Sequence, residues 1–527
     1  MTALRRPVQV RWLGKVSYRE AHDLQAGFHA GGFEHLLLLE HPPTYTLGKR
    51  ARPEHVLVPP ASVGAELVHT DRGGDVTYHG PGQLVGYPIL DLAATPGGAR
   101  DVVAYVRALE DVLIEVCASF GVAAHRDPAY TGVWVGDRKI AAIGVRVARG
   151  RTMHGFALGV DVDLGMFDHI VPCGIHDRGV TSLAAELGGR VPSMREVCDA
   201  VVTAFAHRFG RRVERHDVAW HRPDMSPAGG TVDVVGAAGR RPRWLRVPLR
   251  TTARFRHLQR LVADAGLHTV CQEAGCPNIS ECWSAGTATF MLLGDRCTRA
   301  CGFCLVDSRR PGPLDGDEPR RVADAVAHLG LAHAVLTSVA RDDLPDGGAA
   351  MFAATIREIR ARRGGTTVEV LIPDCKGDPD ALALIFAARP DVLNHNLETV
   401  ARLQRRVRPS ASYARSLAVL ARAKAAGLVT KTGLMVGLGE TRAELEAAIT
   451  DAAALGVDIL TVGQYLRPSA AHLPVARWWT PEEFDDVRAV AEGLGFAYVE
   501  AGPLVRSSYH ARAGADAVAG APDAAAG

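Results

Sequence analysis

The sequence predicts two domains, an α+β domain with a mixed sheet followed by a partial β/α barrel. Candidate strands in residues 1–217 often follow one another directly, whereas strand and helix patterns alternate between residues 288 and 500. Such alternation indicates a parallel sheet. Residues 218–245 are rich in Gly, Pro and Ala and show no periodicity, which is typical of a linker. We therefore expect a first domain over 1–217, a linker over 218–245 and a second domain over 246–513.

The first domain contains both strand and helix patterns. Residues 101–120 and 194–210 show apolar spacings of three and four, which predict helices, and Gly210 is expected to end the second one. Residues 132–147 predict a hairpin with its turn near Gly136. Further strands are expected over 36–40, 84–92 and 154–162.

In the second domain, polar residues follow the predicted strands. Active sites of β/α barrels gather at the carboxyl ends of the strands, so this placement favours a barrel over an open sheet. The residues are Cys297, Ser338, Asp374, Asn396 and Gln464. The strands are expected over 288–293, 332–337, 367–372, 391–395, 428–436, 457–462 and 496–500, with helices over 348–363, 411–426 and 441–455. Residues 514–527 are of low complexity and predict a disordered tail.

Composition excludes several classes of function. A formal net charge of +2 gives no reason to expect nucleic acid or a membrane as a partner. The first residues contain no apolar segment of a secretory signal, and no apolar run is long enough to span a bilayer. We expect a cytoplasmic protein, in which thiols stay reduced.

Six of the ten cysteines fall in two groups, Cys271, Cys276 and Cys282 and then Cys297, Cys301 and Cys304. The spacings are CxxxxCxxxxxC and CxxxCxxC. Structural zinc sites usually take four ligands from paired hooks, and a disulfide framework does not suit a chain without a secretory signal. Thiolates also bind iron–sulfur clusters, and three ligands on a four-iron cluster leave one iron open to a reactant.

The CxxxCxxC group, with Phe303 before its last cysteine, resembles the radical S-adenosylmethionine superfamily. Together with the CxxxxCxxxxxC group, RDDLPDGGA (341–349), HNLETV (395–400) and RSSYHA (506–511), it resembles lipoyl synthases from about Arg246 to about Ala513. That family has a partial β/α barrel. It inserts two sulfurs at carbons 6 and 8 of a protein-bound octanoyl chain.

The resemblance implies two 4Fe–4S clusters, S-adenosylmethionine as a cofactor, and an electron donor such as ferredoxin or flavodoxin. Cys297, Cys301 and Cys304 would hold the cluster that binds S-adenosylmethionine and cleaves it to a 5′-deoxyadenosyl radical. Cys271, Cys276 and Cys282 would hold an auxiliary cluster that supplies the sulfurs. Its fourth ligand would be Ser508, with Ser507 as the alternative.

In the first domain, residues 71–83 read DRGGDVTYHGPGQ, a glycine-rich loop whose backbone permits close approach of a ligand. Taken singly, the loop, Lys139 in GDRKIAAIG and Cys173 in VPCGI each have an ordinary structural interpretation. Together with HGFALG (154–159) they resemble octanoyltransferases over about residues 8–210. Those enzymes share a fold with biotin and lipoate ligases.

This second resemblance implies that Cys173 takes the octanoyl group as a thioester. A nearby ammonium lowers the pKa of a thiol, so Lys139 would hold the thiolate and then remove the proton from the incoming lysine amine. The substrate-binding residues would come from the glycine loop and two strand segments. They are Arg72, Gly73, Gly74, Asp75, Val76, Thr77, Tyr78, His79, Ala142, Ile143, Gly144, Gly155, Phe156 and Ala157.

The sequence thus predicts a bifunctional enzyme that moves octanoyl from acyl carrier protein to a lysine of a lipoyl domain and then converts it to lipoyl. The acceptors would be lipoyl domains of 2-oxoacid dehydrogenases and the glycine-cleavage H protein. Two alternatives concern the first domain. It is either an ATP-dependent lipoate-protein ligase or a non-catalytic module that docks lipoyl domains.

Overall fold

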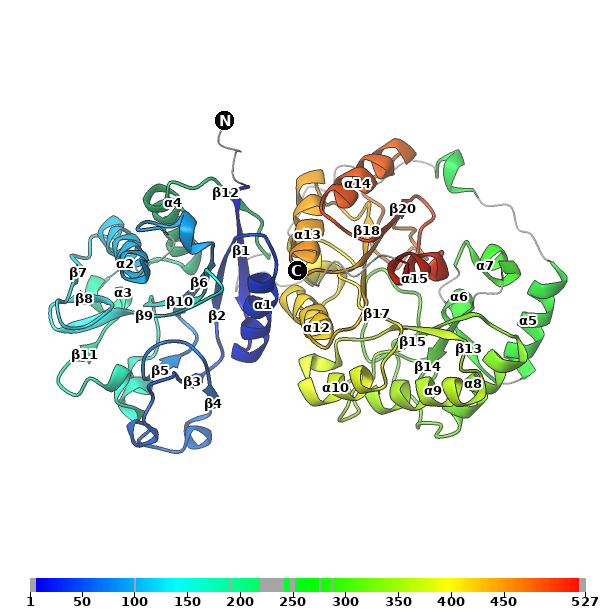
Figure 1. The fold of residues 1–527 in the computed structure, drawn as a ribbon, viewed down its shortest axis with the longest axis horizontal. Helices are drawn as coiled ribbons and strands as arrows, with labels where there is room; N and C mark the ends of the chain where they lie inside the picture. The colour runs from blue at the N-terminus through cyan, green and yellow to red at the C-terminus, as the bar shows by residue number, and fades with distance from the viewer. Residues whose placement is uncertain are drawn as a thin grey trace. The chain divides into compact units, whose positions relative to one another are not determined.

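A computed structural model of the protein describes residues 6–98, 101–189, 191–218, 241–246, 252–264, 266–273, 276–285 and 288–520. Contacts within the chain divide it into two compact units, Met1–His221 and Arg222–Gly527. Each unit is built on its own large sheet (Figure 1). The first sheet is mixed and the second mainly parallel, which confirms the predicted fold class.

The first unit contains a nine-stranded sheet in the order β12-β1-β2-β6-β10-β9-β8-β7, with β11 beside β9. β1 pairs in parallel with β2 and β12, whereas the pairs from β2–β6 to β8–β7 are antiparallel. The strands are β1 (Val8–Lys15), β2 (His35–Glu40), β6 (Gln83–Ile89), β7 (His125–Arg126), β8 (Val133–Val135), β9 (Arg138–Ala148), β10 (Arg151–Gly159), β11 (Gly179–Val180) and β12 (Val213–Arg215).

Helices cover this sheet. α2 (Val102–Ser119) and α4 (Met194–Phe209) pack together over the main core, and Leu36 and Leu38 of β2 join that core. Leu37 and Leu39 are equally buried on the opposite face, because side chains alternate along a strand. α1 (Tyr18–Ala30) packs against β6 and β10, and α3 is Leu183–Leu187. As predicted, Gly210 ends α4 in the left-handed conformation.

A small sheet in the order β4-β3-β5 carries the glycine loop. Its strands are β3 (Thr44–Leu47), β4 (Glu66–His69) and β5 (Val76–His79). Val76 and Tyr78 of β5 belong to an apolar cluster with Tyr45 and Phe167. Thr77 and His79 therefore point to the other face. A short 3-10 turn, Pro172–Gly174, lies beside β5.

The second unit contains an eight-stranded sheet in sequential order from β13 to β20. β13 is antiparallel to β14, and every following pair is parallel. Sequential parallel order is that of a partial β/α barrel. The strands are β13 (His268–Thr269), β14 (Ala288–Leu292), β15 (His333–Ser338), β16 (Thr367–Leu371), β17 (Val392–Asn394), β18 (Thr430–Val436), β19 (Ile459–Gln464) and β20 (Tyr498–Gly502).

The helices between these strands lie outside the sheet (Figure 1). They are α8 (Glu318–His328), α9 (Ala349–Arg362), α10 (Pro379–Ala387), α11 (Gln404–Val407), α12 (Tyr413–Ala425), α13 (Arg442–Ala454) and α14 (Pro481–Gly493). α5 (Ala253–Asp264) precedes β13, α6 (Val270–Glu273) and α7 (Ile279–Ala285) lie between β13 and β14, and α15 (Ala511–Ala519) follows β20. All seven predicted strands and all three predicted helices of this region are present within two or three residues.

Two predicted boundaries differ from the structure. Residues 219–240 of the predicted linker lie outside the described residues, but Arg243–Leu245 form a 3-10 turn in which Leu245 is fully buried. The predicted tail begins too early, because α15 continues to Ala519 and Gly514 packs on Ile459 and Tyr498. Both places contain a buried residue within a segment whose composition predicts a linker or a disordered tail.

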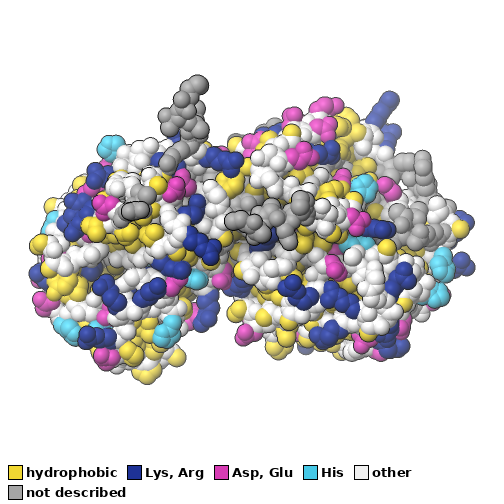
Figure 2. All heavy atoms as spheres, viewed as in Figure 1, with side chains coloured by type: hydrophobic (Ala, Val, Ile, Leu, Met, Phe, Trp, Pro, Cys, Tyr) yellow, Lys and Arg dark blue, Asp and Glu magenta, His cyan; other side chains and the backbone are white. Residues whose placement is uncertain are grey.

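On the face shown in Figure 2, basic and acidic side chains are interspersed. Within the described parts of the chain, every helix is too short or too polar to cross a bilayer.

Candidate active sites

The CxxxCxxC segment lies in the loop after β14, at the carboxyl end of the barrel strands. The Cys297 amide donates to Asp307 O at 2.8 Å, and the Gly302 amide donates to Val407 O at 2.9 Å. The amides of Ala340 and Arg299 point at the Cys297 sulfur, at 3.2 and 3.4 Å. Amide donors to sulfur are a feature of iron–sulfur sites, so this loop fits a cluster.

The CxxxxCxxxxxC segment spans α6 and α7. The Cys276 amide donates to Cys271 O at 3.0 Å, and the Cys282 amide donates to Asn278 O at 2.9 Å. Asn278 Nδ2 donates to Leu504 O at 2.7 Å, which ties this segment to the loop that carries the RSSY motif. Three thiols and a serine loop distant in sequence are thereby brought together.

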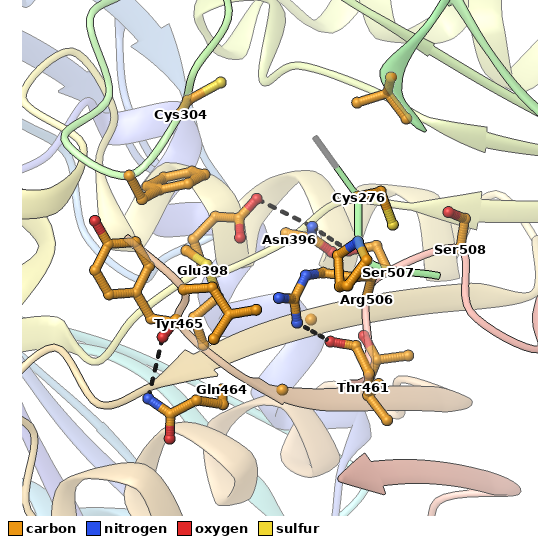
Figure 3. Close-up of a pocket in the computed structure, with 18 of the residues that line it drawn as sticks. Cys276, Cys304, Asn396, Glu398, Thr461, Gln464, Tyr465, Arg506, Ser507 and Ser508 are labelled. Carbon is orange, nitrogen blue, oxygen red and sulfur yellow. Dashed lines mark hydrogen bonds between the residues drawn. The ribbon is translucent and has the colours of Figure 1, made fainter. Parts of the chain in front are cut away.

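A cavity of about 440 Å³ lies between the two cysteine groups. Cys271, Cys276 and Ser508 line one part of it, and Cys304 lines another. Figure 3 shows Cys276 and Ser508 on one side and Cys304 on the other, with polar side chains between them. These polar residues are Asn396, Glu398, Arg506 and Ser507. Leu305, Phe303, Leu466 and Val505 supply apolar walls.

The two serines of the RSSY motif differ in their contacts. Asn396 Nδ2 donates to Ser507 Oγ at 2.5 Å and to Glu398 Oε1 at 3.0 Å. The Ser508 hydroxyl has no hydrogen-bond partner among the described residues and lines the cavity. Ser508 is therefore the serine whose oxygen is available to a metal.

Burial disfavours the thiolate form of three of these cysteines. Burial raises the pKa of Cys282 and that of Cys301 to about 12, and that of Cys271 to about 11. Iron binding deprotonates a thiol, so a cluster would supply the missing charge. Cys375 lies outside both groups. It is buried in the barrel core and does not line the cavity.

In the first unit, Cys173 lies between two small cavities and lines both. One has a volume of about 30 Å³ and is also lined by Lys139, Gln83 and Phe167. The other, of about 50 Å³, is lined by the glycine loop together with β9 and β10. The structure thus brings Cys173, Lys139 and the predicted loop together, although they are far apart in sequence.

Cys173 has φ of 58°, in the left-handed region, within the Pro172–Gly174 turn. Residues other than glycine seldom adopt this conformation, and it occurs at functional sites where the surrounding fold imposes it. The Lys139 ammonium lies 4.8 Å from the centroid of the Trp134 ring. The short turn therefore presents the thiol to both cavities, and Trp134 positions the lysine.

All predicted substrate-binding residues line the larger of these two cavities except Val76 and Tyr78. Those two side chains point into the apolar cluster, because residues alternate along β5. The side chains of these two residues therefore face away from the cavity, and their part in substrate binding stays a prediction.

Sequence reasoning missed three polar side chains that line the same cavity, Tyr18, Tyr87 and His154. His154 Nε2 contacts Asp71 Oδ1 at 2.7 Å, and Asp71 also pairs with Arg146. His154 is the first residue of the HGFALG motif, so the sequence motif could have predicted its place in the site. Tyr18 and Tyr87 come from α1 and β6, and only the fold brings them here.

Arg72 is a buried charged residue that lines this cavity. Its Nη2 donates to Thr46 O at 2.7 Å, which fixes the side chain. Burial lowers the pKa of Arg72, and electrostatic attraction to Tyr18 and Cys173 opposes that effect. A buried guanidinium is thereby held among the residues that line the cavity beside Cys173.

Comparison with known proteins assigns both units. Residues 24–206 match the lipoyl protein ligase A/B catalytic domain, and residues 291–452 match the radical SAM superfamily. A lipoyl synthase of Symbiobacterium thermophilum is 60% identical over 274 residues, which are 52% of this chain and 86% of that protein. Lipoyl synthases of Frankia casuarinae and Mycobacterium avium are 57% and 56% identical over 272 residues, which are 52% of this chain and 82% and 89% of those proteins.

Solved structures also align with each unit. Lipoate-protein ligase A bound with ATP covers 41% of this chain and 90% of its own, with 17% identity and a TM-score of 0.35. Methylornithine synthase covers 46% of this chain and 77% of its own, with 13% identity and a TM-score of 0.33.

These folds and matches define a two-domain enzyme with a lipoyl protein ligase A/B catalytic domain followed by a radical S-adenosylmethionine domain. Through the second unit, the chain belongs to the lipoyl synthase family. It is a bifunctional enzyme of lipoate biosynthesis. Membership implies a 4Fe–4S cluster and S-adenosylmethionine.

Proposed function

We propose that the first unit transfers octanoyl from acyl carrier protein to a lysine of a lipoyl domain through a thioester on Cys173. The second unit then inserts sulfur at carbons 6 and 8 to give lipoyl. The observation that carries the first part is the position of Cys173 between the Lys139 cavity and the glycine-loop cavity. Both proposed reactions need only a thiol, a base and two iron–sulfur clusters.

In the first step, the Cys173 thiolate attacks the thioester carbonyl of the donor, and the carrier thiol leaves. Lys139 and Arg72 stabilise the thiolate, and Lys139 accepts its proton. In the second step, an acceptor lysine attacks the new thioester and Cys173 leaves. ATP is not needed, because the donor is already activated. An ATP-dependent ligase needs a site for an adenylate and does not need a thiol. The placement of Cys173 between the two cavities therefore argues against the ligase alternative.

In the second unit, Cys297, Cys301 and Cys304 would hold the cluster that binds S-adenosylmethionine. Cys271, Cys276, Cys282 and Ser508 would hold an auxiliary cluster. When bound, the first cluster would supply the electron that cleaves S-adenosylmethionine. The auxiliary cluster would supply the sulfur atoms. A serine oxygen is a harder ligand for iron than thiolate, which suits an iron that must be released.

The cavity between the two cysteine groups would hold the octanoyl chain and the adenosyl group. Its apolar walls, which include Leu305 and Leu466, suit an acyl chain. Glu398 and Arg506 supply polar contacts, and burial raises the pKa of Glu398. This volume would exclude water while hydrogens are abstracted.

The partners follow from this chemistry. We propose octanoyl acyl carrier protein as donor, lipoyl domains of 2-oxoacid dehydrogenases and the glycine-cleavage H protein as acceptors, and ferredoxin or flavodoxin as reductant. One aligned structure is described as a bipartite lipoate protein ligase and its E2 lipoyl domain. Clusters and free thiols fit the reducing cytoplasm. A purely docking first unit would not need the cavities around Cys173.

Two measurements test this function. Incubation with octanoyl carrier protein and no ATP should give an octanoyl thioester on the wild-type chain and none on Cys173→Ala. A wild type that acylates the acceptor only with ATP would favour the ligase. The reconstituted chain should hold about eight irons, and replacing either cysteine group by Ala should halve them. Loss of one and the same spectroscopic signal in both triple variants would contradict two clusters.

A further inference from the structure

The cavity of about 50 Å³ beside Cys173 contains a second group able to take a proton. His79, the last residue of β5, is 6% exposed and lines this cavity together with Cys173, whereas Lys139 lines the cavity on the other side of the thiol. The proposed reaction requires two proton transfers. One proton leaves the Cys173 thiol, and another leaves the attacking amine.

Hydrogen bonds fix which nitrogen of His79 carries the proton. Gln83 Nε2 donates to Tyr78 O at 3.2 Å, so the amide oxygen of Gln83 faces the other way. That oxygen, Oε1, lies 2.8 Å from His79 Nδ1. A carbonyl oxygen only accepts, so Nδ1 must be the donor and must carry the hydrogen. In the neutral ring, Nε2 then has a free lone pair.

This lone pair is available to a ligand. Nε2 has no hydrogen-bond partner among the described residues, yet it keeps accessible surface, unlike the fully buried Nδ1 of His154. The ring is held in place by stacking on Tyr18, at 5.9 Å between centroids, and by an edge contact with His41 at 5.5 Å. His79 is therefore a fixed acceptor that faces the cavity.

The surroundings keep the imidazole neutral. Burial, together with His41 and Arg72, lowers the pKa of His79 well below its ordinary value. A neutral ring is the form that accepts a proton. A weak base suffices here, because an amine that has added to a thioester carbonyl carries a positive charge and loses its proton readily.

We infer that His79 Nε2 is the base for the second half of the reaction, in which it accepts the proton of the acceptor lysine while Lys139 serves the thiol. The lysine nitrogen forms a bond to the thioester carbon, and the carbon–sulfur bond breaks with its electron pair on Cys173. The amine proton passes to Nε2, and the imidazolium returns it to the thiolate or to water. This inference rests on the proposed function, and it replaces the second role that Lys139 has by resemblance.

Gln83 is a positioning residue in this scheme. Its amide holds the proton on Nδ1 and so keeps the lone pair on Nε2. Without that acceptor, the ring is free to carry its proton on Nε2, where it cannot take another.

The test separates the two half-reactions in the full-length chain. His79→Asn keeps a donor near the Nδ1 position for Gln83 but removes Nε2. The control is His69→Asn, at an exposed residue of β4 in the same small sheet. Each variant is first acylated with octanoyl carrier protein, and the thioester is followed by intact-mass spectrometry. It is then given either a lipoyl domain or hydroxylamine. Hydroxylamine is a much weaker base than an alkylamine, so its adduct on the thioester carbon is more acidic and loses its proton to water without an enzyme base.

His79→Asn should form the thioester at the wild-type rate and transfer it to hydroxylamine normally, but transfer to lysine should fall roughly 10²–10⁴-fold. Unchanged lysine transfer would overturn the inference. An equal loss with both acceptors would also overturn it, because His79 would then only shape the site. Failure of the wild type to form a thioester would instead contradict the proposed function.

Gln83→Met provides an independent check if the Asn variant does not fold. It should slow lysine transfer and leave hydroxylamine transfer unchanged. Normal lysine transfer in a folded Gln83→Met chain would contradict the tautomer argument.

Discussion

In the proposed mechanism, Lys139 accepts the proton of the Cys173 thiol. Its Nζ lies over the ring of Trp134, and the preceding residue, Arg138, points outward to Glu186. We expect Lys139→Ala to slow thioester formation roughly 10²-fold or more, because the thiol loses its proton acceptor. Arg138→Ala, on the same strand, should change the rate less than about twofold. Stopped-flow measurement of thioester formation in the two variants tests this prediction. Equal rates in the two variants would show that Lys139 does not accept the proton of the thiol.

Ser508 and Ser507 are adjacent residues with different environments. Ser507 Oγ is engaged by Asn396, and the Ser508 hydroxyl has no partner within the described part of the chain. Ser508→Ala should therefore lose iron from the auxiliary cluster and change its electron paramagnetic resonance spectrum. Ser507→Ala should retain both. The opposite pattern would assign the ligand to Ser507.

At the residue scale, motifs located the site better than they described it. Cys173, Lys139 and the glycine loop were predicted from the resemblance of their motifs to octanoyltransferases, and the structure brings them to common cavities. The prediction named the loop residues as one set and did not divide their side chains between the two faces of the strand. Strand alternation, which the sequence analysis did not assign to 76–79, turns Val76 and Tyr78 away. Tyr18 and Tyr87 of this cavity belong to α1 and β6, so no local sequence motif predicts their place in the site.

At the scale of elements, a buried ion pair joins three barrel strands. Lys431 of β18 contacts both oxygens of Glu369 of β16, at 2.9 and 3.1 Å, and Asn394 of β17 donates to the same carboxylate. Burial alone would raise the pKa of Glu369. Lys431 and His333 lower it by more than burial raises it, so the net shift is downward. The pair thus links strands whose carboxyl ends form the cluster cavity.

Lys431→Met should destabilise the second unit by roughly 3–5 kcal/mol, because it leaves a buried carboxylate without its partner. Since the folded pKa of Glu369 is depressed to about 2, its stabilisation is present above the ordinary carboxyl pKa of about 4.3 and is lost progressively as pH falls from that value through the folded pKa. Denaturant unfolding at pH 7 and at about pH 2.5 measures both effects. Arg320→Ala, which breaks an exposed pair with Asp317, should cost less than about 1 kcal/mol. A variant at Lys431 as stable as this control would contradict the argument.

The barrel was predictable element by element because each strand is a short apolar run followed by a helical pattern.

The elements of the first unit were less predictable from the sequence. β1 and α1 were not predicted, although Ser17 and Glu20 form a capping box that the sequence displays. β3, β4 and β5 are four-residue strands among turns, too short for a clear period. Order in Arg243–Leu245 and in α15 depends on burial of Leu245 and Gly514, which composition does not reveal.

For the whole molecule, the question is what the fusion of two activities achieves. The octanoylated lipoyl domain must leave the first site before it reaches the second, so a tether helps only when recapture competes with diffusion. We expect the intact chain to outpace a chain cut by an inserted protease site near residue 230 when the acceptor is scarce. The advantage should vanish when the acceptor is abundant. Equal lipoylation rates at every acceptor concentration would mean that the fusion does not aid transfer between the sites.

The central claim is that one chain performs both steps in order, and intact-mass spectrometry of an apo lipoyl domain tests it most directly. The domain is incubated anaerobically with the holoenzyme, octanoyl carrier protein, S-adenosylmethionine and a reductant. We predict an octanoyl adduct that appears first and is then replaced by lipoyl. Cys173→Ala should yield neither product, and the Cys297, Cys301 and Cys304 triple Ala variant should stop at octanoyl. Lipoyl formed by Cys173→Ala from octanoyl carrier protein, or by the triple variant, would contradict the account.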